Sequence, residues 1–238
     1  MSKFIERLKQ VLQPAPQPMG FRTNNSEQQR PRIQLIARVE TEVAEGKLAA
    51  ADAVVIAGGK INQSESVKGI WLKAADKAEN AAKAGADFIV MPTDSSVISL
   101  DRKIGRVLEV SNANADILLR IIGDLPIDAV IMAEDGSKLT WQKLMQYQRF
   151  AALIDKPIIV QVMPDVTIEE LQSIWDTGVS GIMLKVSKEA DADNLLSLRN
   201  KIDKLTFPVR RKKEKIQATL PNISVPAEEP EEDDDDDE

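Results

Sequence analysis

The stretch DFIVM, residues 87–91, decides the fold class of this chain. A helix-like stretch that closes on Gly85 precedes it, and three other apolar runs recur in a similar setting, at residues 52–57 (DAVVIA), 128–133 (DAVIMA) and 180–186 (SGIMLKV). A continuous apolar run between polar turns is typical of a strand that is covered on both faces. Such strands belong to parallel architectures in which strands and helices alternate, so the sequence predicts an α/β fold.

The composition excludes several kinds of chemistry. The 238 residues contain neither cysteine nor histidine, which rules out disulfides, thiolate nucleophiles, Ser-His-Asp machinery and ordinary zinc sites. Any proton transfer therefore uses Asp, Glu, Lys, Tyr or water. No run reaches the roughly 18 apolar residues of a membrane span, and the N-terminus lacks the apolar core of a signal peptide. We expect a soluble, cytoplasmic protein without a transmembrane segment.

The net charge of −7 is concentrated at one end of the chain. Ten of the 38 acidic residues lie between Glu228 and Glu238, so the rest carries 31 basic and 28 acidic side chains. A near-neutral core gives no electrostatic signal for nucleic-acid binding. The tail follows a basic cluster, Arg210 to Lys215, and its composition predicts disorder. It serves solubility, folds back over the basic cluster, or contacts a basic protein partner.

Three segments are predicted. Residues 1–18 comprise an amphipathic helix and a proline-rich linker, residues 19–209 a β/α barrel, and residues 210–238 the basic cluster and acidic tail. In the helix, Phe4, Ile5, Leu8 and Val11 recur at helical spacing, which predicts packing against the open bottom of the barrel. Attachment to a membrane surface is the alternative for this short helix.

Seven strands are predicted within the barrel, at residues 33–39, 53–58, 87–92, 106–111, 127–133, 157–163 and 180–186. Helix starts separate them: Asn62 with Glu65 and Thr167 with Glu170 have capping-box spacing, and Thr140 precedes a helix from Trp141. Gly85 and Gly178 follow two helix ends, where a left-handed residue is favoured.

The segments GADFIVMP (85–92), KPIIVQV (156–162) and GVSGIMLKV (178–186) resemble those of the aldolase-type TIM (βα)8 barrels. This resemblance implies an eight-stranded parallel barrel with its site at the C-terminal ends of the strands. It carries over no catalytic residue. The eighth strand is expected at residues 19–23 or 205–209. An open, doubly wound parallel sheet is the alternative fold.

In either fold, polar residues after the strands converge on one face. These candidates are Glu40, Lys60, Thr93, Asp94, Glu109, Asn112, Glu134, Asp135, Gln161, Lys185 and Ser187. Lys185 is the leading one, because burial at the end of an apolar strand would lower its pKa and make it a nucleophile. The alternative for Lys185 is an outward side chain that reaches water. Glu134 and Asp94 are the predicted acid/base groups.

Anion contacts are predicted at two places. Gly58, Gly59 and Lys60 precede a predicted helix start, where backbone amides attract phosphate, although the stretch matches no phosphate-loop motif. Ser187 follows the last strand, a usual anion position in a barrel. The sequence names no cofactor, and no acidic cluster indicates a metal.

Two functions follow from these observations. One is a lyase or isomerase acting on a small anionic metabolite by lysine and carboxylate chemistry. The other is a non-catalytic barrel that binds a protein through its N-terminal helix and charged tail. The fold does not decide between them.

Overall fold

Eight parallel strands form a closed barrel in the computed structural model, which describes residues 2–12, 32–40, 45–57, 67–72, 84–95, 103–133, 137–187 and 191–206. Each strand pairs with the next, and β8 closes the barrel on β1. The strands are β1 Gln34–Val39, β2 Ala53–Ala57, β3 Lys68–Trp71, β4 Phe88–Pro92, β5 Gly105–Ser111, β6 Ala129–Ala133, β7 Ile158–Gln161 and β8 Gly181–Val186.

Closure confirms the predicted barrel and shows that the doubly wound alternative is wrong. The expected position of the eighth strand is also wrong, because β3, Lys68–Trp71, completes the barrel between β2 and β4. Residues 19–23 lie outside the described part of the chain, and Leu205 comes after the last helix rather than in a strand. The predicted boundary at residue 18, the basic cluster and the acidic tail lie outside the described residues as well.

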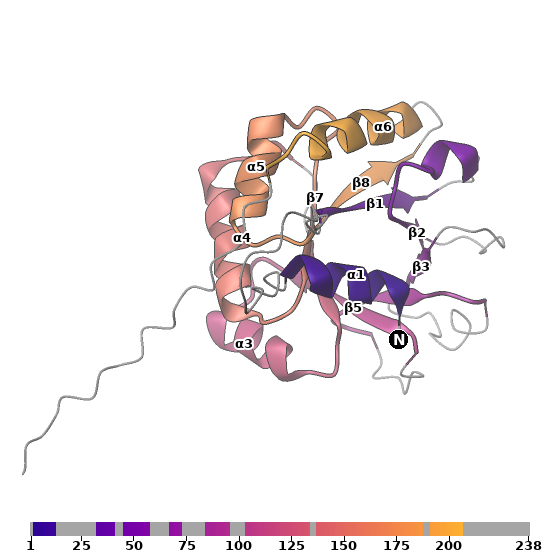
Figure 1. Ribbon diagram of the computed structural model, residues 1–238. Helices are drawn as coiled ribbons and strands as arrows, with labels where there is room; N and C mark the ends of the chain where they lie inside the picture. Colours follow the sequence, from indigo (N-terminus) through magenta and orange to yellow (C-terminus); the bar gives the residue numbers. More distant parts are fainter. Residues whose placement is uncertain are drawn as a thin grey trace, which may run out of the picture.

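Helices cover the outside of β5 to β8 (Figure 1). They are α3 Asp116–Asp124, α4 Trp141–Leu153, α5 Ile168–Asp176 and α6 Asp191–Ile202, and a short 3-10 helix, η1 Glu45–Leu48, follows β1. The strand residues that point outward, such as Leu35, Ala37 and Ile182, pack with these helices into the larger apolar cluster. Within the described residues, no helix is long and apolar enough to cross a membrane.

In the part of the chain that the structure describes, the helix ends lie where local sequence signals predict them. Thr140 accepts a hydrogen bond from the Lys143 amide at the start of α4, and Thr167 and Glu170 form a reciprocal capping box on α5. Gly85 and Gly178 have φ angles of 81° and 108°, the left-handed region that favours glycine. The predictions for Thr140, Thr167 and Gly178 are confirmed, as is the left-handed conformation of Gly85, whereas the helix end expected before Gly85 and the Asn62 capping box lie outside the described residues.

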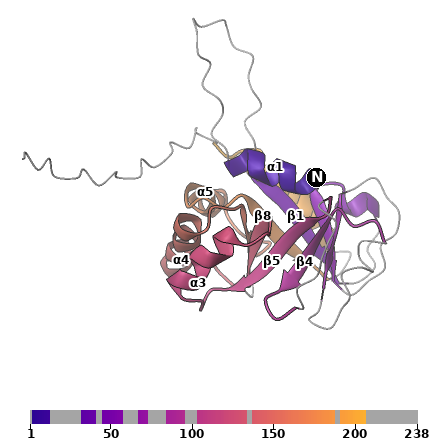
Figure 2. The same cartoon turned by 90° about the horizontal axis from the view of Figure 1, so that it is seen from below.

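The first helix, α1 Lys3–Leu12, lies across one end of the barrel (Figure 2). Its apolar face is buried, and Phe4, Ile5 and Leu8 join the inward-facing strand residues in a second cluster. The ring of Phe4 stacks on that of Phe88, with centroids 4.4 Å apart. This confirms the predicted packing against the barrel bottom and leaves the apolar face unavailable to a membrane.

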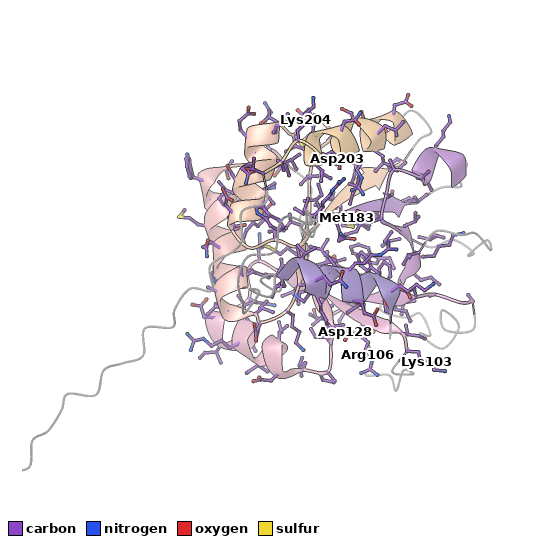
Figure 3. All side chains as sticks on the ribbon, in the orientation of Figure 1. Lys103, Arg106, Asp128, Met183, Asp203 and Lys204 are labelled. Carbon is purple, nitrogen blue, oxygen red and sulfur yellow. The ribbon has the colours of Figure 1, made fainter. Side chains whose placement is uncertain are left out.

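Polar contacts hold α1 at both of its ends. The Asp87 carboxylate, at the start of β4, accepts hydrogen bonds from the Ser2 hydroxyl and the Lys3 and Phe4 amides, at 2.6, 3.0 and 3.1 Å. Lys9 pairs with Asp128 at 3.4 Å, and Asp128 also accepts the Arg106 amide. Figure 3 labels Asp128 and Arg106 beside α1. The helix therefore closes the N-terminal end, which leaves the C-terminal end as the open face of the barrel.

Candidate functional site

The C-terminal mouth of the barrel gathers charged side chains from β1 and β8. Ile36 and Met183 belong to the interior cluster, and alternate residues of a strand share a face. Arg38 and Lys185 therefore also face the barrel interior, one step closer to the mouth. The two residues are direct partners in the β1–β8 ladder, so closure of the barrel brings them together.

Glu40, just past β1, binds both cations. Its Oε2 lies 3.0 Å from Lys185 Nζ, and its Oε1 lies 3.5 Å from Arg38 Nη2. The Lys185 side chain is 45% exposed. The expected burial of the Lys185 ammonium is therefore wrong. The ammonium forms an ion pair with Glu40 and stays partly exposed to solvent. Lys185 points inward, which the alternative of an outward side chain did not expect, but it reaches water as that alternative predicted.

Arg38 lies over the indole of Trp71, at the end of β3, with its guanidinium carbon 4.2 Å from the ring centroid. Such cation–π contact favours a flat guanidinium that is held by one of its faces. Together with Glu40, Ala57, Leu72, Pro92 and Glu109, these two residues line a cavity of about 420 Å³. Its volume falls in the usual range of small-molecule sites, about 300 to 1,000 Å³.

The opposite wall of this mouth cavity carries a second carboxylate. Glu109 and Pro92 are ladder partners on β5 and β4, and both line the cavity. Among the described residues Glu109 has no hydrogen-bond or ion-pair partner. The cavity lining therefore presents one cation, Arg38, and two carboxylates, Glu40 and Glu109, and Lys185 adjoins it through its ion pair with Glu40.

Two other residues predicted from the sequence, Asp94 and Ser187, come just after the ends of β4 and β8. Asp94 is exposed in the turn that follows β4. Gly58, Gly59, Lys60 and Glu134 lie outside the described residues. The Ser187 amide donates to the Asp191 carboxylate at 2.9 Å, so an internal acceptor already occupies this amide. The roles assigned to these residues stay predictions.

Comparison with known proteins gives the fold and no closer relationship. No family model matches the chain, and no curated protein matches it. Among solved structures, thiamine phosphate pyrophosphorylase from Pyrococcus furiosus is similar at a TM-score of 0.53 and 12% identity, covering 72% of this chain and 96% of that one. A mutant tryptophan synthase alpha-subunit from the same organism is similar at 0.51 and 13% identity, covering 73% and 98%. The fold is a TIM barrel. At this identity the comparison carries no catalytic residue to this chain.

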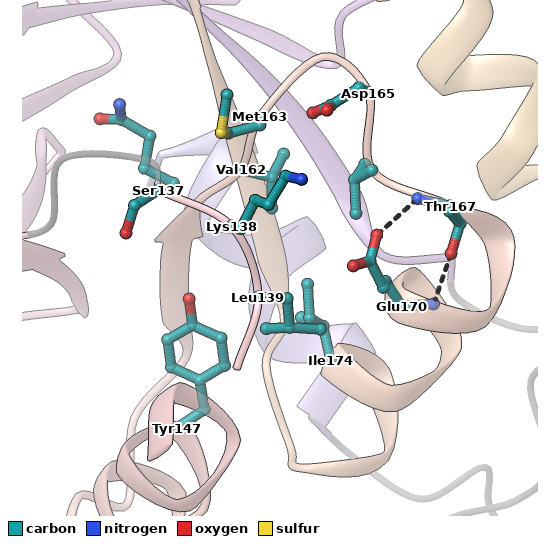
Figure 4. A pocket seen from close by; sticks show the side chains of 12 residues that line it. Ser137, Lys138, Leu139, Tyr147, Val162, Met163, Asp165, Thr167, Glu170 and Ile174 are labelled. Carbon is teal, nitrogen blue, oxygen red and sulfur yellow. Dashed lines mark hydrogen bonds between the residues drawn. The ribbon is translucent and has the colours of Figure 1, made fainter. Parts of the chain in front are cut away.

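A second, smaller cavity of about 210 Å³ lies beside the mouth of the TIM barrel, between the segments that follow β6 and β7. Figure 4 shows Lys138, Tyr147, Asp165 and the Thr167–Glu170 pair around it. Glu170 is engaged in the capping box of α5, so this carboxylate has a structural role already. Gln161, a rim candidate from the sequence, lines this second cavity rather than the mouth cavity.

Arg38 and Trp71, which carry the chemistry of the mouth cavity beside Glu40, were missed by the sequence analysis. Glu40, Glu109 and Lys185 follow from their places at the ends of strands, but Arg38 and Trp71 do not. The available signal for Arg38 is its spacing of two residues from Glu40, which puts both on one face of a strand. Trp71 gave no usable signal, because its strand was not recognised.

Proposed function

We propose that this TIM barrel is an enzyme, a lyase or isomerase, that acts on a small anionic metabolite through Lys185 and the carboxylates near it. The observation that supports this proposal is the Lys185–Glu40 pair, 3.0 Å apart at the mouth of the barrel. Active sites of TIM barrels lie at this end of the strands. A lysine nitrogen next to a proton acceptor is the arrangement that imine formation needs.

In the proposed reaction, the Lys185 ammonium first gives a proton to Glu40. The freed amine then bonds to a substrate carbonyl carbon, and the carbonyl oxygen leaves as water with one proton from the amine nitrogen and one returned by Glu40. The protonated imine that results withdraws electrons from the neighbouring carbon. Proton removal at that carbon gives isomerisation, and cleavage of a carbon–carbon bond beside it gives a lyase reaction.

Glu40 takes the acid/base role closest to Lys185. Glu109 stands on the other wall of the cavity and is proposed as the second proton carrier, since no described residue occupies it. Asp94 and Glu134, which the sequence predicts for these roles, remain proposed contributors. Arg38, the basic side chain of the cavity lining, is proposed to attract the anionic part of the substrate.

Borohydride trapping tests the proposal. The protein is incubated with small aldehydes, keto acids and phosphorylated sugars in the presence of borohydride, which reduces an imine to a stable secondary amine. Intact mass and peptide mapping are expected to show an adduct on Lys185. Lys185→Met removes the adduct, whereas Lys138→Met, in the second cavity, retains it. Absence of any adduct across the panel, or an adduct on Lys138 alone, refutes the proposal.

The alternative function, a non-catalytic barrel that binds a protein partner, loses one of its two elements. The apolar face of α1 is buried inside the chain, so only its polar face is left for a partner. The acidic tail remains as the proposed contact. Its test is binding of a basic protein such as lysozyme by the intact chain and by a variant truncated after Val209.

A further inference from the structure

The guanidinium of Arg38 has donors that the described residues do not satisfy. Among the described residues its Nε is buried without a hydrogen-bond partner, and its ion pair with Glu40 is 3.5 Å long. Buried polar groups in folded proteins are nearly always paired, so an exception calls for an explanation. The stack on Trp71 fixes one face of the guanidinium, which leaves its edge to bind a ligand.

Glu40 shows what kind of group fits between the cations. Its carboxylate spans from Arg38 to Lys185 through its two oxygens. The two cations are therefore one carboxylate apart. A ligand whose carboxylate binds Arg38 would bring its next carbon close to Lys185, and Glu40 would then be released to exchange a proton with the lysine.

The mouth favours a carboxylate over a phosphate. A guanidinium matches the two coplanar oxygens of a carboxylate through parallel hydrogen bonds, whereas a phosphate dianion needs several further donors. The described cavity lining supplies few, because Arg38 is its only basic side chain and Glu40 and Glu109 are acceptors that would repel a dianion. The Ser187 amide, the predicted anion donor after β8, already binds Asp191.

We infer that Arg38 is the carboxylate anchor of this site and that its ligand is a short 2-oxo acid, with the carboxylate on Arg38 and the adjacent carbonyl at Lys185. The assignment of the carbonyl rests on the proposed function. The assignment of the carboxylate to Arg38 rests on the guanidinium geometry alone.

Calorimetric titration of the full-length protein at constant ionic strength tests the anchor. Lactate has the carboxylate without the keto group, methyl lactate lacks the charge, and inorganic phosphate offers the competing anion. Lactate and pyruvate are expected to bind, and methyl lactate and phosphate to bind at least about tenfold more weakly, the equivalent of one charge-assisted hydrogen bond. Arg38→Lys keeps the positive charge but loses the paired donors of the guanidinium, and it should weaken lactate binding by a similar factor. Arg120→Lys, on the exposed side of α3, has no effect.

Lactate binding that is unchanged in Arg38→Lys, or phosphate binding as tight as that of lactate, overturns the anchor. So does failure of both carboxylates to bind. The comparison of lactate with its ester uses the unaltered protein, so it stands even if a variant does not fold. Lactate bound through Arg38, with no borohydride adduct from pyruvate, supports the anchor and refutes imine formation. An adduct with glyceraldehyde and no binding of lactate supports imine formation and refutes the anchor.

Discussion

Substitution of Asp87 by alanine is expected to weaken the attachment of α1 to the barrel. One carboxylate accepts the Ser2 hydroxyl and two amides from the first turn of α1, so it is a helix N-cap supplied by a distant strand. Loss of an N-cap costs about 0.5 to 2 kcal/mol. Ser2 and Phe4 are buried, and each buried donor left without a partner adds about 1 to 3 kcal/mol. Because these contributions overlap, we expect a loss of about 3 kcal/mol in the free energy of unfolding.

Urea unfolding followed by circular dichroism measures this loss, and the melting temperature should fall by about 6 to 12 °C for a domain of this size. Asp94→Ala is the matched control, because Asp94 follows the other end of β4 and is exposed. It should change stability by less than about 0.5 kcal/mol. Equal, small effects of the two substitutions would refute the idea that Asp87 holds the helix in place.

Three further substitutions test the packing and the electrostatics. In Gly105→Ala, the added Cβ would lie 2.5 Å from Ile5 Cγ1, so urea unfolding should show a loss of about 1 to 3 kcal/mol, while Gly46→Ala, in open space, stays near neutral. Thr167→Ala removes the capping box of α5 and should cost about 1 kcal/mol in the same assay. Burial, the main cause, lowers the pKa of Lys156, and the charge of Lys9 adds to this against the opposing charge of Asp128. Between the lowered pKa of Lys156 in the folded chain and its unfolded value of about 10.4, the unfolded chain holds more protons, so stability relative to Lys156→Met should rise with pH across that alkaline window. A flat difference in unfolding free energy would refute this.

Most of the barrel could be predicted because its strands follow local rules. Runs such as DFIVM and DAVIMA are apolar on both faces, and their ends carry turn residues whose preferences are local. The site was only partly predictable. Lys185 and Glu40 stand at strand ends, which any parallel barrel brings to one face. Their contact with each other, and with Arg38, depends on the β1–β8 register, and no local pattern specifies how the last strand meets the first.

Strand β3 was not predicted because its sequence gives no apolar run, and the packing of α1 inside the barrel is the physical reason for that sequence. Its four residues, KGIW, contain a lysine and a glycine and so give no apolar run. Gly69 faces the barrel interior, where an added Cβ would overlap the ring of Phe88, and that ring stacks on Phe4 of α1. The same need for space recurs at Gly105 beside Ile5 and at Gly181 beside Leu8. A glycine inside a strand often marks such a close approach. The inserted helix requires small residues in the strands around it, and those residues remove the pattern by which one of the strands would have been recognised.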